Sequence, residues 1–140
     1  MNKHHYVAIM AGGGGSRGLP MSRTDHPKQF LDILNTGKTL IQQTFDRYNK
    51  LVPAENIFVV TSKEYVSAVK NQLPLIPVEN ILGEPSRKNT APCIAYIALK
   101  LLKKDPDALM VAAPADHLVL ETDKFIKTST VALDFVDHFN

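Results

Sequence analysis

Short apolar runs recur along the chain and are separated by stretches with helical spacing. Residues 6–11, 57–60 and 109–113 are such runs, each followed by polar or turn-forming residues, and they predict buried strands. A shorter run at residues 78–82 follows the chain-breaking Pro74 and Pro77. Because strands alternate with helices, the pattern predicts an α/β domain with three layers around a mostly parallel sheet.

Three helical patterns are expected here, two of them with candidate N-caps. Residues 40–51 follow Thr39, which suits the N-cap position, and they place apolar side chains on one face. A second helix is expected to run from Thr61 or Ser62, either of which can serve as its cap, towards Leu73. A helical pattern also covers residues 122–139.

The clearest helical pattern is expected to begin at Thr90 and to end before Asp105, which is followed by proline. Its apolar residues recur at i, i+3, i+4, i+7 and i+8, which is the spacing of a helix with one buried face. These stripe residues are Ile94, Ile97, Ala98, Leu101 and Leu102.

The composition is that of one globular domain. The chain has 140 residues, of which 44% are hydrophobic and 21% charged, close to the average of globular proteins. Sixteen basic and 14 acidic residues give a net charge of +2, which argues against nucleic acid or an anionic membrane as a partner. A single cysteine excludes an internal disulfide framework, and we expect a cytoplasmic protein without a signal peptide or membrane span.

Residues 12–17 combine four glycines with a serine and an arginine directly after the first predicted strand. Glycines let backbone N–H groups approach a phosphate closely, and Arg17 adds a planar set of donors. The alternative is a flexible turn with a solvated arginine. The dinucleotide fingerprint is matched by letter at Gly13, Gly15 and Gly18, but Pro20 follows and no acid ends the second strand.

Three further segments carry groups that suit phosphate or metal chemistry. Lys28 follows a rigid proline and offers a point charge for phosphate, although it could be an ordinary surface lysine. Residues 84–92 are polar up to the start of a helix, which Asn89 and Thr90 could simply cap. Asp116 follows the third long apolar run and could bind Mg²⁺, or it could be a strand-end turn residue. Since Asp116 and the glycine loop both follow strands, we expect them to face one crevice at the carboxyl edge of the sheet.

Together these segments resemble the N-terminal part of the mannose-1-phosphate guanylyltransferases, within the sugar-phosphate nucleotidyltransferases. The family's Ala-Gly-Gly-x-Gly-Ser/Thr-Arg stands at residues 11–17 and its Pro-Lys-Gln-Phe-Leu at residues 27–31. Its Glu-Pro-x-x-Arg/Lys-Asn-Thr-Ala-Pro stands at residues 84–92, and its Pro-Ala-Asp-His at residues 114–117. The four motifs keep the family's order and spacing, and the third favours the guanylyl branch.

The resemblance implies a Rossmann-like nucleotide-diphospho-sugar transferase fold, with residues 1–140 as its nucleotide-binding N-terminal portion. The implied reaction converts GTP and mannose 1-phosphate into GDP-mannose and pyrophosphate with Mg²⁺. Arg17, Lys28 and Asp116 would then be catalytic, and Asp116 would also hold the metal. The implied nucleotide-binding residues are Ala11, Gly12, Gly13, Gly15, Ser16, Glu84, Asn89 and Thr90, the last three at the guanine and ribose.

Two departures from the family pattern affect what is expected of this chain. Gly18 and Leu19 stand where the family has a bulky apolar residue and an aromatic, and the extra glycine should loosen the loop by ~0.5–1 kcal/mol. Family members are also much longer, so the sugar-binding half and a second metal-binding aspartate are expected outside these residues. A non-catalytic GTP-binding fragment and, more remotely, a dinucleotide-dependent oxidoreductase stay open, as does a homo-oligomeric state.

Overall fold

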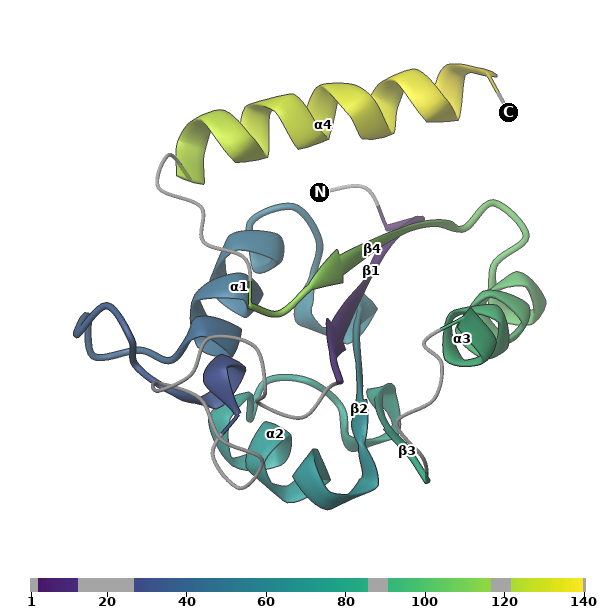
Figure 1. Cartoon of the computed structure of the whole chain (residues 1–140). Coiled ribbons are helices and arrows are strands. Elements are labelled where there is room, and N and C mark those ends of the chain that lie inside the picture. Colours follow the sequence, from purple (N-terminus) through teal and green to yellow (C-terminus); the bar gives the residue numbers. More distant parts are fainter. Residues whose placement is uncertain (1–2, 13–26, 86–90, 117–121, 140) are drawn as a thin grey trace.

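A computed structural model of the chain describes residues 3–12, 27–85, 91–116 and 122–139 (Figure 1). One sheet has the strand order β3-β2-β1-β4, and every neighbouring pair in it is parallel. The strands are β1 (His5–Ala11), β2 (Ile57–Ser62), β3 (Ile81–Glu84) and β4 (Leu109–Pro114). The predicted α/β class with a parallel sheet is therefore confirmed.

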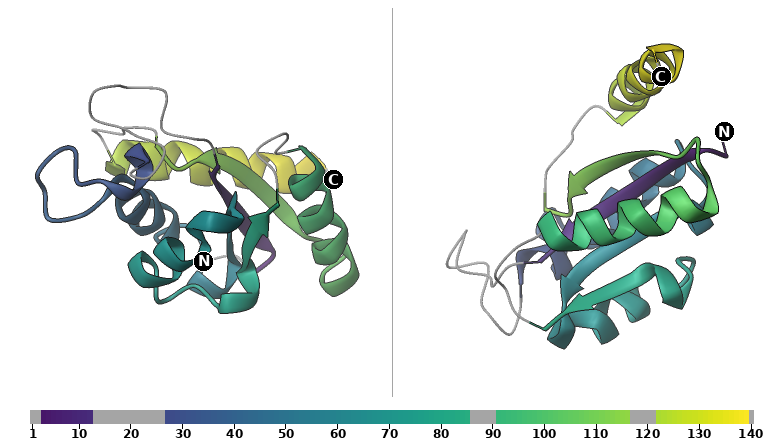
Figure 2. Two further views of the ribbon diagram at one scale, coloured as in Figure 1. Left: turned by 60° about the horizontal axis from the view of Figure 1, so that its bottom comes forward. Right: turned by 90° about the vertical axis from the view of Figure 1, so that its right-hand side faces the viewer.

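Helices cover both faces of the sheet, as the three-layer prediction requires. Helices α1 (Leu40–Asn49) and α2 (Val66–Gln72) lie on one face, and α3 (Ala91–Lys104) lies on the other (Figures 1 and 2). Helix α4 (Thr122–Phe139) packs beside α1, where its Phe125 ring lies edge-on to Tyr48. Among the helices described, none combines the length and the apolarity that crossing a bilayer requires.

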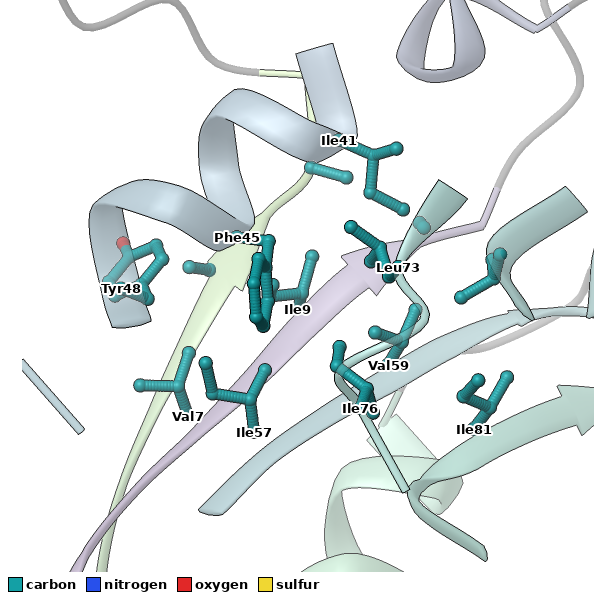
Figure 3. Close-up of a cluster of buried hydrophobic side chains, with 14 of the residues drawn as sticks. Val7, Ile9, Ile41, Phe45, Tyr48, Ile57, Val59, Leu73, Ile76 and Ile81 are labelled. Carbon is teal, nitrogen blue, oxygen red and sulfur yellow. The ribbon is translucent and has the colours of Figure 1, made fainter. Parts of the chain in front are cut away.

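The core has two parts because successive residues of a strand point to opposite faces of the sheet. In β1, Val7 and Ile9 point towards α1 and α2, whereas Tyr6 and Ala8 point towards α3. The larger cluster, on the α1 side, is formed by branched aliphatic side chains around Phe45 (Figure 3). Since β1 is central and covered on both faces, its apolar run is continuous, as is typical of parallel sheets.

The start of α1 confirms the prediction made from Thr39. The Thr39 side chain accepts a hydrogen bond from the Gln42 backbone N–H, and the Gln42 side chain accepts one from the Thr39 N–H. This reciprocal pair is a capping box, which satisfies two donors that a helix start leaves open. The predicted span of residues 40–51 is two residues too long, because the helix ends at Asn49.

The predicted cap of the following helix is wrong. Strand β2 continues to Ser62, a 3-10 turn follows at Lys63–Tyr65, and α2 begins without a side-chain cap. The Thr61 hydroxyl instead donates to the carbonyl oxygen of Ala11 at 3.0 Å. Thr61 and Ser62 therefore belong to strand β2, and the Thr61 side chain binds the neighbouring strand instead of the start of a helix.

The stripe on α3 is narrower than predicted. Ile97 and Leu101 are buried, whereas Leu102 is 53% exposed. Successive residues of a helix are 100° apart around its axis, so Leu102 points in a different direction from the buried Leu101. No second described helix lies on this face of the sheet to cover it. The placement of Leu102 on the buried stripe is therefore wrong, and Tyr96 and Leu99 share its exposure.

Candidate functional site

Two of the predicted site residues meet at the carboxyl edge of the sheet. The Lys28 Nζ lies 4.0 Å from the Asp116 Oδ2, and the two side chains are 36% and 43% exposed. An ion pair this exposed contributes only about 0–1 kcal/mol to stability. Both groups remain accessible to a ligand.

The pair sits where the order of the strands reverses. From β1 the chain passes to β2 and β3 on one side, and then returns to form β4 on the other side of β1. Met10 and Pro114 are paired in register, so Gly12 and Asp116 follow neighbouring strand ends. In open parallel sheets, ligands bind in the crevice that such a reversal creates beyond the carboxyl ends.

The turn that carries Lys28 is fixed from two sides. This 3-10 turn, Lys28–Phe30, follows Pro27, and its buried Gln29 donates from Nε2 to the Ala11 carbonyl at 3.1 Å. The Phe30 carbonyl accepts a hydrogen bond from Gln72 on α2 at 3.3 Å. Lys28 is therefore held against the end of β1, while its own side chain reaches towards solvent.

The predicted nucleotide loop begins at a well-anchored peptide. The Ala11 carbonyl oxygen accepts from both Gln29 and Thr61, so this oxygen is engaged inside the protein. Gly12 is exposed, and a Cβ at that position would meet no atom of the described residues within 4 Å. Six other predicted site residues lie outside the described residues: Gly13, Gly15, Ser16, Arg17, Asn89 and Thr90.

Glu84 ends β3 at the same edge of the sheet. Its Oε1 is buried and has no hydrogen-bond partner within the described part of the chain. A buried oxygen left without a donor typically costs about 1–3 kcal/mol, so it is suited to accept from a ligand. Strand β2 separates β3 from β1, which places Glu84 roughly 10 Å along the sheet edge from the end of β1.

Two buried polar residues of α1, Thr44 and Arg47, lie next to each other, and Thr44 contacts the segment that carries Asp116. The Thr44 hydroxyl is fully buried and lies 2.9 Å from the Ala115 carbonyl oxygen. The Arg47 guanidinium is next to it, with its carbon 5.2 Å from the centre of the Phe125 ring and 5.7 Å from that of Tyr48. Burial lowers the pKa of Arg47, and burial likewise raises the pKa of Tyr48.

Sequence reasoning missed Gln29, Thr44 and Arg47. A signal for the last two exists, because both lie among the apolar positions of α1 rather than on its polar face. Gln29 carries no comparable signal, since it stands in a short polar segment. Each of the three has a partner far away in the sequence, namely Ala11, Ala115 and Phe125, which a local pattern does not reveal.

A second polar cluster lies at the opposite, amino edge of the sheet. One ligand atom each from His4, Asp105 and Asp107 fall within 4.8 Å of one another. The hydrogen bond from His4 Nδ1, at 2.7 Å, lowers the pKa of Asp105, which also accepts from the Tyr6 hydroxyl at 3.1 Å. These bonds tie the start of β1 to the turn before β4, and the cluster is separate from Asp116.

The fold and the motifs place the chain in a known family. The nucleotidyl transferase family model matches residues 6–132, and the chain belongs to this family. Its relatives include a mannose-1-phosphate guanylyltransferase from Salmonella montevideo, 41% identical over 122 residues, which cover 86% of this chain. A second, from Escherichia coli K12, is 40% identical over 124 residues, or 86% of this chain. The alginate biosynthesis protein AlgA of Pseudomonas putida is 42% identical over 114 residues, or 79% of this chain.

The matches cover only part of each relative. The chain spans about a quarter of the length of these curated relatives, with values of 25%, 26% and 23%. A solved structure from Thermus thermophilus, described as a mannose-1-phosphate geranyltransferase, is 30% identical with a TM-score of 0.80. That match covers 94% of this chain and 38% of the other. A Helicobacter pylori structure described as mannose-6-phosphate isomerase, 24% identical with a TM-score of 0.66, supports the fold alone and covers 92% and 46% of the two chains.

Family membership confirms the resemblance read from the four motifs. This membership gives no support to the hypothesis that the chain is a dinucleotide-dependent oxidoreductase. The end of β2 at Thr61 and Ser62 agrees with this, because no acid stands where a dinucleotide site needs one.

Proposed function

We propose that this chain serves the transfer of a guanylyl group from GTP to mannose 1-phosphate, which gives GDP-mannose and pyrophosphate. Residues 1–140 would supply the nucleotide-binding portion. The observation that carries the proposal is the meeting of Lys28 and Asp116 at the reversal point of the sheet in a nucleotidyl transferase. The names of the curated relatives point to mannose 1-phosphate as the acceptor.

Charge is the main requirement of this chemistry. An oxygen of the sugar phosphate attacks the α-phosphorus of GTP, and negative charge moves to the leaving pyrophosphate. Preorganised cations lower the barrier when they face the oxygens on which that charge develops. The accessible ammonium of Lys28 suits this role, and Arg17 is proposed as the second cation.

The residues present also fit Mg²⁺. Asp116 offers accessible carboxylate oxygens, which are the donors that Mg²⁺ prefers. Magnesium in nucleotide sites is usually held by one or two carboxylates together with the substrate's phosphates, so a single aspartate is a reasonable contribution from this portion. When bound, the ion would neutralise phosphate charge.

Glu84 is proposed to contact the base. A carboxylate accepts hydrogen bonds, and the pairing edge of guanine presents two neighbouring N–H donors, whereas that of adenine presents an acceptor beside its amino group. The buried Oε1 without a donor supports this assignment, as does its place along the sheet edge from Lys28. We therefore expect GTP to bind at least about tenfold more tightly than ATP, a difference of ~1.4 kcal/mol.

Calorimetry on the 140-residue chain tests the proposal. Asp116→Asn and Lys28→Met are each expected to weaken Mg²⁺-dependent GTP binding about tenfold, or ~1.4 kcal/mol. Lys70→Met removes the same charge from an exposed position on α2 and should leave binding unchanged. Binding of NAD without binding of GTP would instead favour the oxidoreductase, and absence of nucleotide binding would end the proposal.

Pyrophosphate release with mannose 1-phosphate separates an active chain from a non-catalytic GTP-binding fragment. The chain covers about a quarter of its relatives, which favours a fragment that binds GTP and turns over little. The reason is positional, since a misplacement of about 1 Å of the attacking group can cost ~100-fold in rate. Turnover within tenfold of a full-length relative, lost on Arg17→Ala, would show that the sugar site lies within residues 1–140.

A further inference from the structure

We infer that Thr44 is a positioning residue for Asp116, because its buried hydroxyl holds the peptide group that leads into Asp116. The inference rests on the proposed metal-binding role of Asp116. It assigns a function to a residue of α1 that belongs to none of the four motifs. It also explains why a polar side chain is buried on the apolar face of that helix.

The peptide between Ala115 and Asp116 lies just beyond the end of β4. The Ala115 N–H still donates to the Met10 carbonyl at 2.9 Å, which continues the ladder with β1. Its carbonyl points the other way and lies 2.9 Å from the Thr44 Oγ1. Because a peptide group is planar, fixing this carbonyl also fixes the N–H of Asp116 and the position of the Cα from which its side chain leaves the backbone.

The hydroxyl proton of Thr44 has two nearby acceptors, and only one of them lacks another donor among the described residues. Thr44 Oγ1 is 2.9 Å from both the Leu40 and the Ala115 carbonyl oxygens. The Leu40 carbonyl faces the helical N–H four residues on, so it already has a donor. Among the described residues, Thr44 is the one donor to the Ala115 carbonyl. Arg47 Nη2 approaches the hydroxyl oxygen at 3.5 Å, on the accepting side of the hydroxyl.

Valine has nearly the shape of threonine but no hydroxyl, so it would leave the Ala115 carbonyl without its donor among the described residues. The neighbours of Thr44 on α1 are Leu40, Ile41 and Phe45, which are all buried. The end of β1 shows a comparable arrangement, since buried Gln29 and Thr61 both hold the Ala11 carbonyl. Each of the two strand ends at the candidate site is therefore held by a buried side-chain donor.

Thr44→Val and Thr44→Ser separate the hydroxyl from the shape of the side chain. We expect Thr44→Val to need about five- to tenfold more Mg²⁺ for half-maximal GTP binding by calorimetry, and Thr44→Ser to stay within about twofold of the natural chain. In the ligand-free protein, the NMR signals of the Asp116 amide and side-chain carboxyl should move in Thr44→Val and return in Thr44→Ser. Thr130→Val is the control for the change itself, because the exposed Thr130 hydroxyl bonds, among the described residues, only the Ile126 carbonyl of its own helix α4.

The outcomes distinguish this inference from the proposed function. A Thr44→Val chain that is folded and keeps both the Mg²⁺ dependence and the Asp116 signals of the natural chain overturns the inference, whatever its stability. If the natural chain binds GTP without any dependence on Mg²⁺, the metal role of Asp116 fails, and the Asp116 signals alone then decide whether Thr44 positions it. If Thr44→Val does not fold, Thr44→Cys takes its place, since a thiol is a weaker donor of similar size.

Discussion

Replacing the buried Arg47 with methionine is expected to stabilise the protein by about 1–2 kcal/mol. Arg47 is 5% exposed, and its Nε has no hydrogen-bond partner within the described residues. A charged group buried with an unmet donor costs about 3 kcal/mol or more. The contacts with the Phe125 and Tyr48 rings, at 5.2 and 5.7 Å, lie near the outer limit of cation–π attraction and return roughly 1 kcal/mol each. Methionine keeps the unbranched stem and a favourable sulfur–ring contact.

Urea unfolding of the natural chain, Arg47→Met and Arg47→Lys at pH 7 measures this difference. For a chain of 140 residues, 1 kcal/mol corresponds to about 3 °C in Tm, so Arg47→Met should melt about 3–6 °C higher. Arg47→Lys keeps the charge but loses the planar stacking group, and it should be less stable than the natural chain. An Arg47→Met chain that is less stable, with an unchanged m-value, would refute the reasoning, since it would mean that the ring contacts outweigh the cost of burying the charge.

Two further changes test the packing and the charges of the fold. Asp105→Asn should lower stability at pH 7 and less so at pH 3: the folded-state pKa of Asp105 is lowered, so its contribution is complete above the usual carboxyl pKa of about 4 and declines as the pH falls from there through the lower value. Urea titrations at both pH values check this, and equal losses would contradict it. Gly83→Ala should cost about 1–3 kcal/mol, because the new Cβ would lie 2.7 Å from Val66 Cγ2 and 3.1 Å from the Lys63 Cα. Gly12→Ala, with open space at its Cβ, is the control for stability and should change it little.

Local signals were enough to predict most elements of the fold. The apolar run of β1 and the cap at Thr39 depend on the segment itself and on its immediate neighbours, and both are confirmed. The errors at Thr61 and Leu102 have a different origin. Thr61 lies inside β2 and bonds a carbonyl on another strand, and Leu102 is exposed because of how α3 lies on the sheet. Both outcomes depend on how distant segments pack together, which a local pattern does not show.

The candidate site, too, is predicted only in part by the sequence. Motifs identify Lys28, Glu84 and Asp116 as residues of interest, and the alternation of strands and helices predicts the edge of the sheet at which they lie. The side chains that hold this edge in place, Gln29 and Thr44, escape prediction because each bonds a backbone carbonyl of a different segment. Buried polar contacts of this kind are set by the packing of whole elements.

The central place of β1 has a consequence for the order in which the chain is made. β1 pairs with β2 about 50 residues later, but its other neighbour, β4, begins about 100 residues after it. At roughly 5–20 residues per second, a ribosome leaves one edge of β1 unpaired for ~5–20 s after that strand emerges. An apolar strand with open backbone groups readily joins other strands during such an interval. Synthesis of this chain therefore has a vulnerable stage that ends only when β4 arrives, and slow translation or a shortage of chaperones will lower the yield of folded protein.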